Sequence, residues 1–298
     1  MYFFIVGNEK CGTSALAEWI VSNGWAKYLG GRKGIKEPNI LTTSDFQLPW
    51  VDPDHHVLDA STGYALNSVA LSRLPQKRCK VIFCIRNAFH RAWSSYKFKK
   101  LISMGEGSFL RTVPDSMVTN SHEPEDLLSL LCKAQATHYP PKVRSKIREY
   151  CHKEYADIRD TNFIERCNYE LDFFLSYRFF PIVNVLEGSF YTYPIRNIVE
   201  FVDLENFTII SVSELSKPKK MSKFINANFG KIENVGPLPE VLRTTEFDIG
   251  EAKPDFSCSS FDNLRRMFAS DYRNFMGELE RAQIDPSLID QNKLVEFL

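Results

Sequence analysis

The chain has 298 residues, 44% of them hydrophobic and 25% charged, so it can bury a large core as one globular domain or a domain with an elaborate insertion. Lys plus Arg and Asp plus Glu both number 37, which excludes a global field that would recruit nucleic acid or an anionic membrane. Seven cysteines without a C-x-x-C pair favour reduced core thiols of a cytosolic protein over a disulfide framework, and no metal-binding cluster is visible.

The first predicted unit is a strand, a short turn and a helix. Tyr2–Val6 is a strand by its apolar run, and Thr13–Ser22 is a helix that Asn23-Gly24 ends. The turn between them carries Gly7, Lys10 and Gly12. Backbone N–H groups of such a turn and of a helix N-terminus bind anions, which the helix dipole also favours. The stretch therefore predicts a phosphate site.

The spacing Gly7-x4-Gly12 nearly matches the nucleotide triphosphate loop G-x-x-x-x-G-K-[ST], but Thr13 stands where that loop has lysine. The cation lies inside the turn, at Lys10. In this form the stretch resembles the 5′-phosphosulfate loop of sulfotransferases that use 3′-phosphoadenosine 5′-phosphosulfate (PAPS), marked by lysine followed by [SCG]-G-T-[TS]. The resemblance implies a set of donor-binding residues: Lys10, Cys11, Gly12, Thr13 and Ser14. An ordinary strand-to-helix turn of any α/β protein remains the alternative for this motif alone.

The next candidate is the acid of Lys36-Glu37-Pro38. Proline disfavours helix at Glu37, so an extended segment or strand end is expected there, near the crevice where open α/β sheets bind ligands. Glu37 is either a general base or a surface glutamate before a turn, and position alone favours the second. Together with the first loop, however, K-E-P-x-[FIL]-[FL] resembles the segment of heparan-type and bacterial carbohydrate sulfotransferases that holds their catalytic base.

The segment from Asp54 to Tyr64 is predicted to be a short strand followed by a turn that resembles [DE]-x-[ST]-[PT]-x-Y of the same enzymes. It departs from the animal heparan enzymes at Ala60, where they usually have lysine. His55 and His56 are alternative bases, since aryl sulfotransferases use histidine, although a histidine at a strand start is more often structural.

Lys80–Ile85 is the clearest buried strand, as expected for the centre of a parallel sheet. It delivers Arg86 at its carboxyl end, and Asn87 can cap a helix from Ala88. Arg86 and Ser94 can reach one phosphate as guanidinium fork and hydroxyl donor. This spacing is common by itself, but the stretch resembles R-[DN]-x-x-x-R-x-x-S-x-[YW], the 3′-phosphate site of PAPS enzymes.

The remaining pattern is mainly helical, with apolar residues at helical spacing in three segments: Glu123–His138, Pro141–Ile158 and Asn162–Tyr177. A further strand is predicted over Phe207–Val212 and a long helix over Phe261–Leu279. The cluster Lys217, Lys219, Lys220 and Lys223 is more simply a solvated helix face than a ligand site.

Two phosphate-binding elements in the right order, with an acid between them, identify the chain as resembling a PAPS-dependent sulfotransferase. The resemblance implies an α/β fold with a P-loop-like central parallel β-sheet flanked by helices. It implies one domain over 1–298, divided into donor-binding units, a helical insertion on the acceptor side and a closing part: 1–100, 101–185 and 186–298. It also implies sulfuryl transfer from PAPS to a hydroxyl or amine of a carbohydrate or glycolipid, with Glu37 as base, Lys10 as catalytic cation, 3′-phosphoadenosine 5′-phosphate (PAP) as product, and no metal.

Two other interpretations stay open: a P-loop kinase or NTPase with a degenerate loop, and an inactive protein that keeps the nucleotide fold. The acceptor, the choice between O- and N-sulfation and the oligomeric state are not determined by the sequence. If the chain is full length, its direct entry into a strand and its lack of a long apolar run predict no signal peptide, no membrane span and a cytoplasmic location.

Overall fold

A computed structural model describes most of the 298-residue chain. The described residues are 1–29, 36–42, 46–52, 54–105, 128, 132, 140–230, 232, 235–238 and 247–298.

The centre of the molecule is a parallel sheet of five strands in the order β2-β3-β1-β4-β5. The strands are β1 (Tyr2–Ile5), β2 (Lys27–Tyr28), β3 (Val57–Asp59), β4 (Cys79–Cys84) and β5 (Phe207–Ile210). All neighbouring pairs run parallel, with Phe4 opposite both Asp59 and Val81. The carboxyl ends of all five strands therefore share one edge.

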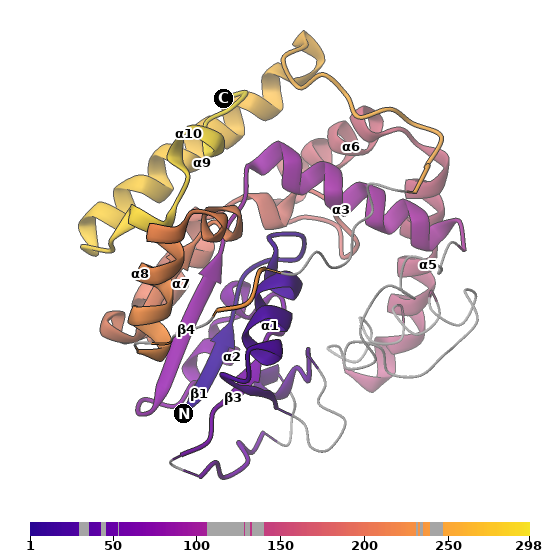
Figure 1. Cartoon of the computed structure of the whole chain (residues 1–298). Coiled ribbons are helices and arrows are strands. Elements are labelled where there is room, and N and C mark those ends of the chain that lie inside the picture. The colour runs from indigo at the N-terminus through magenta and orange to yellow at the C-terminus, as the bar shows by residue number, and fades with distance from the viewer. Residues whose placement is uncertain are drawn as a thin grey trace.

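Helices cover both faces of the sheet, as Figure 1 shows. The helices of the described residues are α1 (Thr13–Ser22), α2 (Ser68–Ser72), α3 (Ala88–Ser103), α5 (Arg144–Asp160), α6 (Phe163–Tyr177), α7 (Thr192–Phe201), α8 (Pro218–Phe229), α9 (Asp262–Arg281) and α10 (Gln291–Leu294). Phe3 points to the face of α1 and α8, where its ring lies 4.7 Å from that of Phe229. Phe83 points to the opposite face and contacts Tyr191, next to α7, at 6.1 Å. The fold class is α/β, as the sequence predicted.

A second hydrophobic cluster lies beside the sheet, between α3, α5, α6 and α9. Phe89 of α3 is at its centre, with ring centroids of Phe256, Phe261 and Phe268 5.1 to 5.8 Å away. α3 thus belongs to two parts of the molecule, because it starts at the end of β4 and continues into this helical layer. None of the helices in the described part of the chain is long and apolar enough to cross a membrane.

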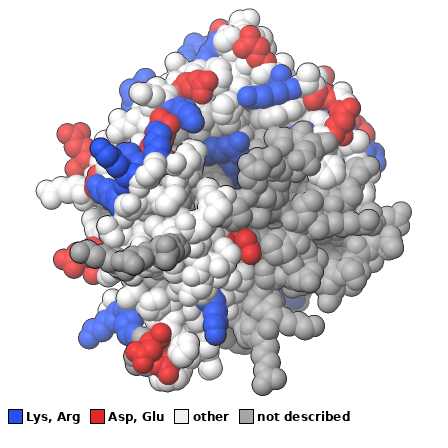
Figure 2. All heavy atoms as spheres, in the orientation of Figure 1, with Lys and Arg blue, Asp and Glu red and all other residues white. Residues whose placement is uncertain are grey.

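Most predicted elements are present within one or two residues of their expected bounds. Asn87 caps α3 by accepting a hydrogen bond from the His90 N–H at 3.0 Å, as predicted, and Asn162 forms a capping box with Glu165 at the start of α6. The helix expected over 123–138 lies, apart from residues 128 and 132, outside the described residues. Two lysines of the cluster from Lys217 to Lys223 are paired with acids, since Lys217 lies 2.6 Å from Glu214 and Lys223 2.6 Å from Asp285. Figure 2 shows Lys and Arg side chains gathered on this side of the molecule.

A buried ion-pair cluster joins α5 to α6. The Arg166 guanidinium donates to Glu170 at 2.7 Å and to Glu154 at 2.6 Å, and all three side chains are at most 2% exposed. Glu170 in turn accepts from the backbone N–H groups of Val185 and Leu186 at 2.8 to 2.9 Å. The cluster therefore fixes the chain after α6 as well as the two helices.

Replacing Arg166 with methionine should lower the free energy of unfolding by about 3–5 kcal/mol, because it leaves two buried carboxylates without a cation. Urea denaturation followed by circular dichroism measures the change. Arg159→Met is the matched control, since Arg159 pairs with Asp160 on the exposed surface and its loss should not change the midpoint measurably. Equal effects of the two variants would contradict this account of the cluster.

Candidate functional site

The turn after β1 passes directly over the end of β4. A Cβ at Gly7 would lie 2.8 Å from the Cys84 carbonyl oxygen and 2.9 Å from its nitrogen, so only glycine fits there. Gly12 has φ 89°, in the left-handed region that glycine adopts without strain, and a Cβ on it would come 3.0 Å from Val212, just after β5. Lys10 also has a positive φ, 66°. The sequence pattern thus produces a tight turn at the shared edge of β1, β4 and β5.

The turn leads into the N-terminus of α1, where Gly12 is the N-cap and supplies no side-chain cap. The first N–H groups of the helix are therefore left for another acceptor. Cys11 and Thr13 are buried, and the Cys11 thiol contacts the Tyr191 hydroxyl at 3.6 Å, while Ser14 is half-buried. A ligand at this turn would meet Cys11 and Thr13 through their backbone only.

Lys10 is the cation of the turn. Its Nζ lies 4.5 Å from the centroid of the Phe98 ring on α3. Burial lowers the pKa of Lys10 to about 8, an effect that one nearby carboxylate opposes and three nearby cations increase. These groups are Glu9, Arg86, Lys99 and Lys36. Cations from three separate segments therefore surround the turn, an arrangement that favours a bound anion.

Arg86 stands at the carboxyl end of β4, as predicted. Its side chain donates to the Lys10 carbonyl at 3.2 Å, which brings two predicted donor-binding residues together. Its backbone is held by the Tyr191 hydroxyl, which accepts from the Arg86 N–H at 3.1 Å and donates to the Arg86 carbonyl at 2.7 Å. No role in the site is predicted for Tyr191 from the sequence.

Glu37 lies outside helices and strands, as expected before Pro38, and its side chain is 37% exposed. Its carboxylate forms an ion pair with the buried ammonium of Lys36 and accepts from the Thr62 hydroxyl at 3.2 Å. The Lys36 carbonyl accepts from the Ala60 N–H at 2.9 Å, so this segment runs beside the chain that leaves β3. Lys36 interacts with both predicted residues, because its ammonium pairs with Glu37 and its charge helps to lower the pKa of Lys10.

Asp59 fixes the neighbouring turn after β3. Its buried carboxylate accepts from the Ser61 N–H at 2.9 Å and from the Tyr64 hydroxyl at 2.8 Å. Ser61 then accepts from the Asn39 N–H at 2.9 Å, which anchors the chain just after Glu37. Burial raises the pKa of Asp59 to about 6, against the lowering effect of these hydrogen bonds.

Ser94 is not joined to Arg86 in the structure. It is half-buried on α3, and within the described residues no hydrogen bond links it to Arg86 or to the turn. His55 and His56, the alternative bases, precede β3 and so lie at the opposite edge of the sheet from Glu37. The geometry therefore gives no support to either histidine.

No family model and no curated protein matches the sequence. Among solved structures, the chain is similar to a sulfotransferase from Alicyclobacillus acidocaldarius at 16% sequence identity and a TM-score of 0.48. The match covers 93% of this chain and 95% of that one.

Two residues of the arginine pattern on α3 have internal contacts that the sequence did not predict. Arg91 is fully buried and donates to the carbonyls of Glu9 at 3.1 Å and Val185 at 2.8 Å. Tyr96 donates to the Thr161 carbonyl at 2.7 Å. These side chains support the turn and the helical layer through contacts within the chain.

Proposed function

We propose that this protein is a sulfotransferase that moves the sulfuryl group from PAPS to a hydroxyl or amine of a carbohydrate acceptor. One observation carries the proposal. The cations Lys10, Arg86 and Lys36 converge, with the carboxylate of Glu37, on an uncapped helix N-terminus at the carboxyl edge of a parallel sheet. Such a site binds phosphate groups and places a base beside them.

The residues fit a donor that carries two phosphate positions. Lys10 and the backbone N–H groups around Gly12, Thr13 and Ser14 would hold the 5′-phosphosulfate, and the close approach at Gly7 leaves the turn compact enough for backbone contacts. Arg86 would hold the 3′-phosphate, with Ser94 of α3, eight residues further along the chain, as a hydroxyl donor. PAPS, when bound, supplies the sulfuryl group and a phosphate that accepts charge as the leaving group.

The chain supplies a base and a cation for the transfer. Glu37 would take the proton of the acceptor hydroxyl or amine on its half-exposed carboxylate, which is open to an acceptor from solvent. Lys10 and the turn amides would stabilise negative charge on the 5′-phosphate oxygen. Lys36, in contact with Glu37, would keep that carboxylate oriented. The preference for carbohydrate rests on the likeness of Lys36-Glu37-Pro38 to carbohydrate sulfotransferases.

Titration calorimetry with PAP, compared with ATP and Mg²⁺, tests the donor. We expect PAP to bind without metal, and Arg86→Ala to weaken it about 10- to 150-fold, because a charged hydrogen bond contributes about 1.5–3 kcal/mol. Arg159→Ala is the control, an arginine on the exposed end of α5. Preference for ATP with Mg²⁺ would instead favour a kinase or NTPase, and binding of neither nucleotide would favour an inactive scaffold.

A further inference from the structure

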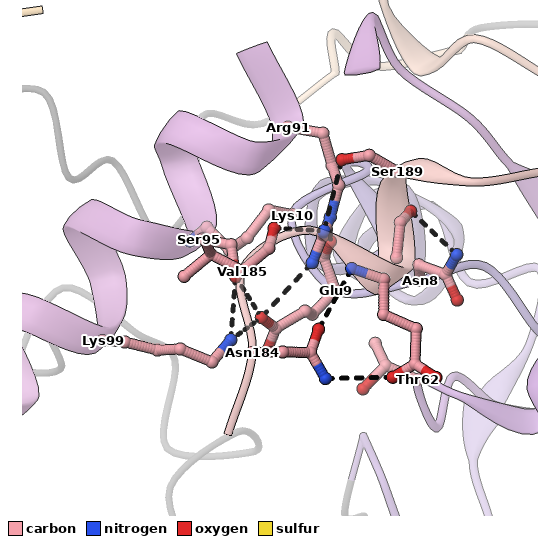
Figure 3. A network of polar contacts seen from close by, with 12 residues as sticks. Asn8, Glu9, Lys10, Thr62, Arg91, Ser95, Lys99, Asn184, Val185 and Ser189 are labelled. Atoms are coloured by element: carbon pink, nitrogen blue, oxygen red, sulfur yellow. Dashed lines mark hydrogen bonds and ion pairs between the residues drawn. The ribbon is translucent and has the colours of Figure 1, made fainter. Parts of the chain in front are cut away.

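An acid stands inside the turn, one residue before the cation that the proposed reaction needs. The Glu9 carboxylate forms an ion pair with Lys99, accepts from the Ser95 hydroxyl at 2.5 Å and lies 3.5 Å from the Arg91 guanidinium. All three partners are on α3, at positions 91, 95 and 99, one helical turn apart. Figure 3 shows them reaching from the helix toward Glu9.

The cations of this network are buried, whereas the Glu9 side chain is 35% exposed. The side chains of Lys99 and Arg91 are 8% and 2% exposed, and Lys99 also donates to Ser95 at 2.8 Å. Burial by itself would raise the pKa of Glu9, but the charges of Lys99 and Arg91 and the hydrogen bonds outweigh it and hold the pKa at about 2. Glu9 is therefore held in its ionised form, and its charge compensates the burial of the two cations.

The same contacts set the direction of the backbone. The Arg91 Nε donates to the Glu9 carbonyl at 3.1 Å, and Arg86 donates to the Lys10 carbonyl at 3.2 Å. Because C=O and N–H of a trans peptide point in opposite directions, fixing the Glu9 carbonyl also fixes where the Lys10 N–H points. Lys10 is held in this way at φ 66°, a conformation that a non-glycine residue adopts only when its surroundings impose it.

We propose that Glu9 is a positioning residue of the donor site, which ties the turn to α3 through Lys99, Ser95 and Arg91 and so aims Lys10 and the turn amides. The effect of Glu9 on donor binding rests on the proposed function. Its effect on the conformation of the turn rests on the hydrogen bonds alone. Glu9 touches no substrate in this role. It acts by holding the turn in the form that receives an anion before the anion arrives.

Glu9 also supplies the nearest negative charge to Lys10. Three cations from other segments act on Lys10 in the opposite sense, and they are Arg86 after β4, Lys99 on α3 and Lys36 before β3. Removing the charge of Glu9 would therefore move the pKa of Lys10 below its present value of about 8. Since a raised pKa keeps Lys10 protonated and a lowered one releases the proton, the basic limb of the pH profile for kcat/KM should move to lower pH in Glu9→Gln.

The affinity for PAP in Glu9→Gln separates positioning from simple charge. Loss of an anion from an anion site would by charge alone tighten PAP binding, whereas loss of a positioning residue should weaken it, by about tenfold in Kd. Lys99→Met should have a similar effect. The matched control is Lys100→Met, since Lys100 is the next residue on α3 but donates to Tyr96 at 2.7 Å and to the Thr161 carbonyl at 2.9 Å, away from the turn.

Hydrogen exchange of the Cys11 amide, which donates to the Asn8 carbonyl at 3.3 Å across the turn, tests the structural part separately when it is measured without nucleotide. We expect exchange at least about tenfold faster in Glu9→Gln than in wild type and unchanged exchange in Lys100→Met. PAP binding in Glu9→Gln as tight as in wild type, or tighter, or exchange that stays slow, would overturn the inference. If wild type binds no PAP, the proposed function fails, and the exchange rates still decide whether Glu9 holds the turn.

Discussion

Lys10→Met is expected to lower kcat/KM for sulfuryl transfer by about 100- to 1,000-fold, the usual effect of removing one donor from developing negative charge. Methionine keeps the length of the side chain and its packing against Phe98 but removes the ammonium. The effect follows from the position of Lys10, because other cations near the turn belong to different segments and already have partners. Initial rates with PAPS and an acceptor polysaccharide measure the loss.

Lys27→Met is the control for this variant. Lys27 is exposed in β2 and bonds through its N–H to the His56 carbonyl, at the amino edge of the sheet, so its charge lies away from the turn. We expect its kcat/KM to stay within about twofold of wild type, as for surface substitutions in general. A Lys10→Met enzyme as active as Lys27→Met would remove Lys10 from the chemistry.

Glu37→Gln should reduce kcat by about 100- to 10,000-fold and leave the Kd for PAP nearly unchanged, because a general base acts on the acceptor and not on the donor. Glutamine keeps the size of the side chain and can still accept from Thr62, but it cannot take a proton. Steady-state kinetics and calorimetry on the same preparation give both quantities. Glu200→Gln, on the exposed surface of α7, is the matched control.

The separation of kcat from PAP affinity is the informative part of this experiment. Glu37 is in an ion pair with buried Lys36, so a structural role would appear as weaker PAP binding through movement of Lys36. If Glu37→Gln lost tight PAP binding, the result would argue that the acid organises the donor site. Unchanged turnover would show that the base is another group.

Local signals predicted the part of the site that depends on short stretches of chain. The glycines of the turn, the apolar run of β4 and the cap at Asn87 each act within a few residues, so their outcome could be read from the sequence. β2 could not be predicted in this way, because Lys27–Tyr28 is only two residues long and has no periodic pattern.

The contacts of Glu9 could not be predicted, because they join positions separated by about 80 to 90 residues, and only the sheet order brings α3 beside the turn. One signal was present: an acid between Asn8 and Lys10 has the wrong charge for an anion site. A carboxylate at such a place favours cations from elsewhere in the chain as partners, and the buried Arg91 and Lys99 are those cations.

The hydroxyl of Tyr191 bonds to both the N–H and the carbonyl of the Arg86 backbone. The free edge of β4 is covered by β5, which comes late in the chain, at residues 207–210. A ribosome synthesises the turn after β1 and the end of β4 long before it makes these residues. Until then β4 exposes an unpaired edge, and the backbone of Arg86 lacks its support. The proposed donor site would thus be completed late in synthesis, and a nascent chain that ends before Tyr191 would carry its sequence motifs without the assembled turn.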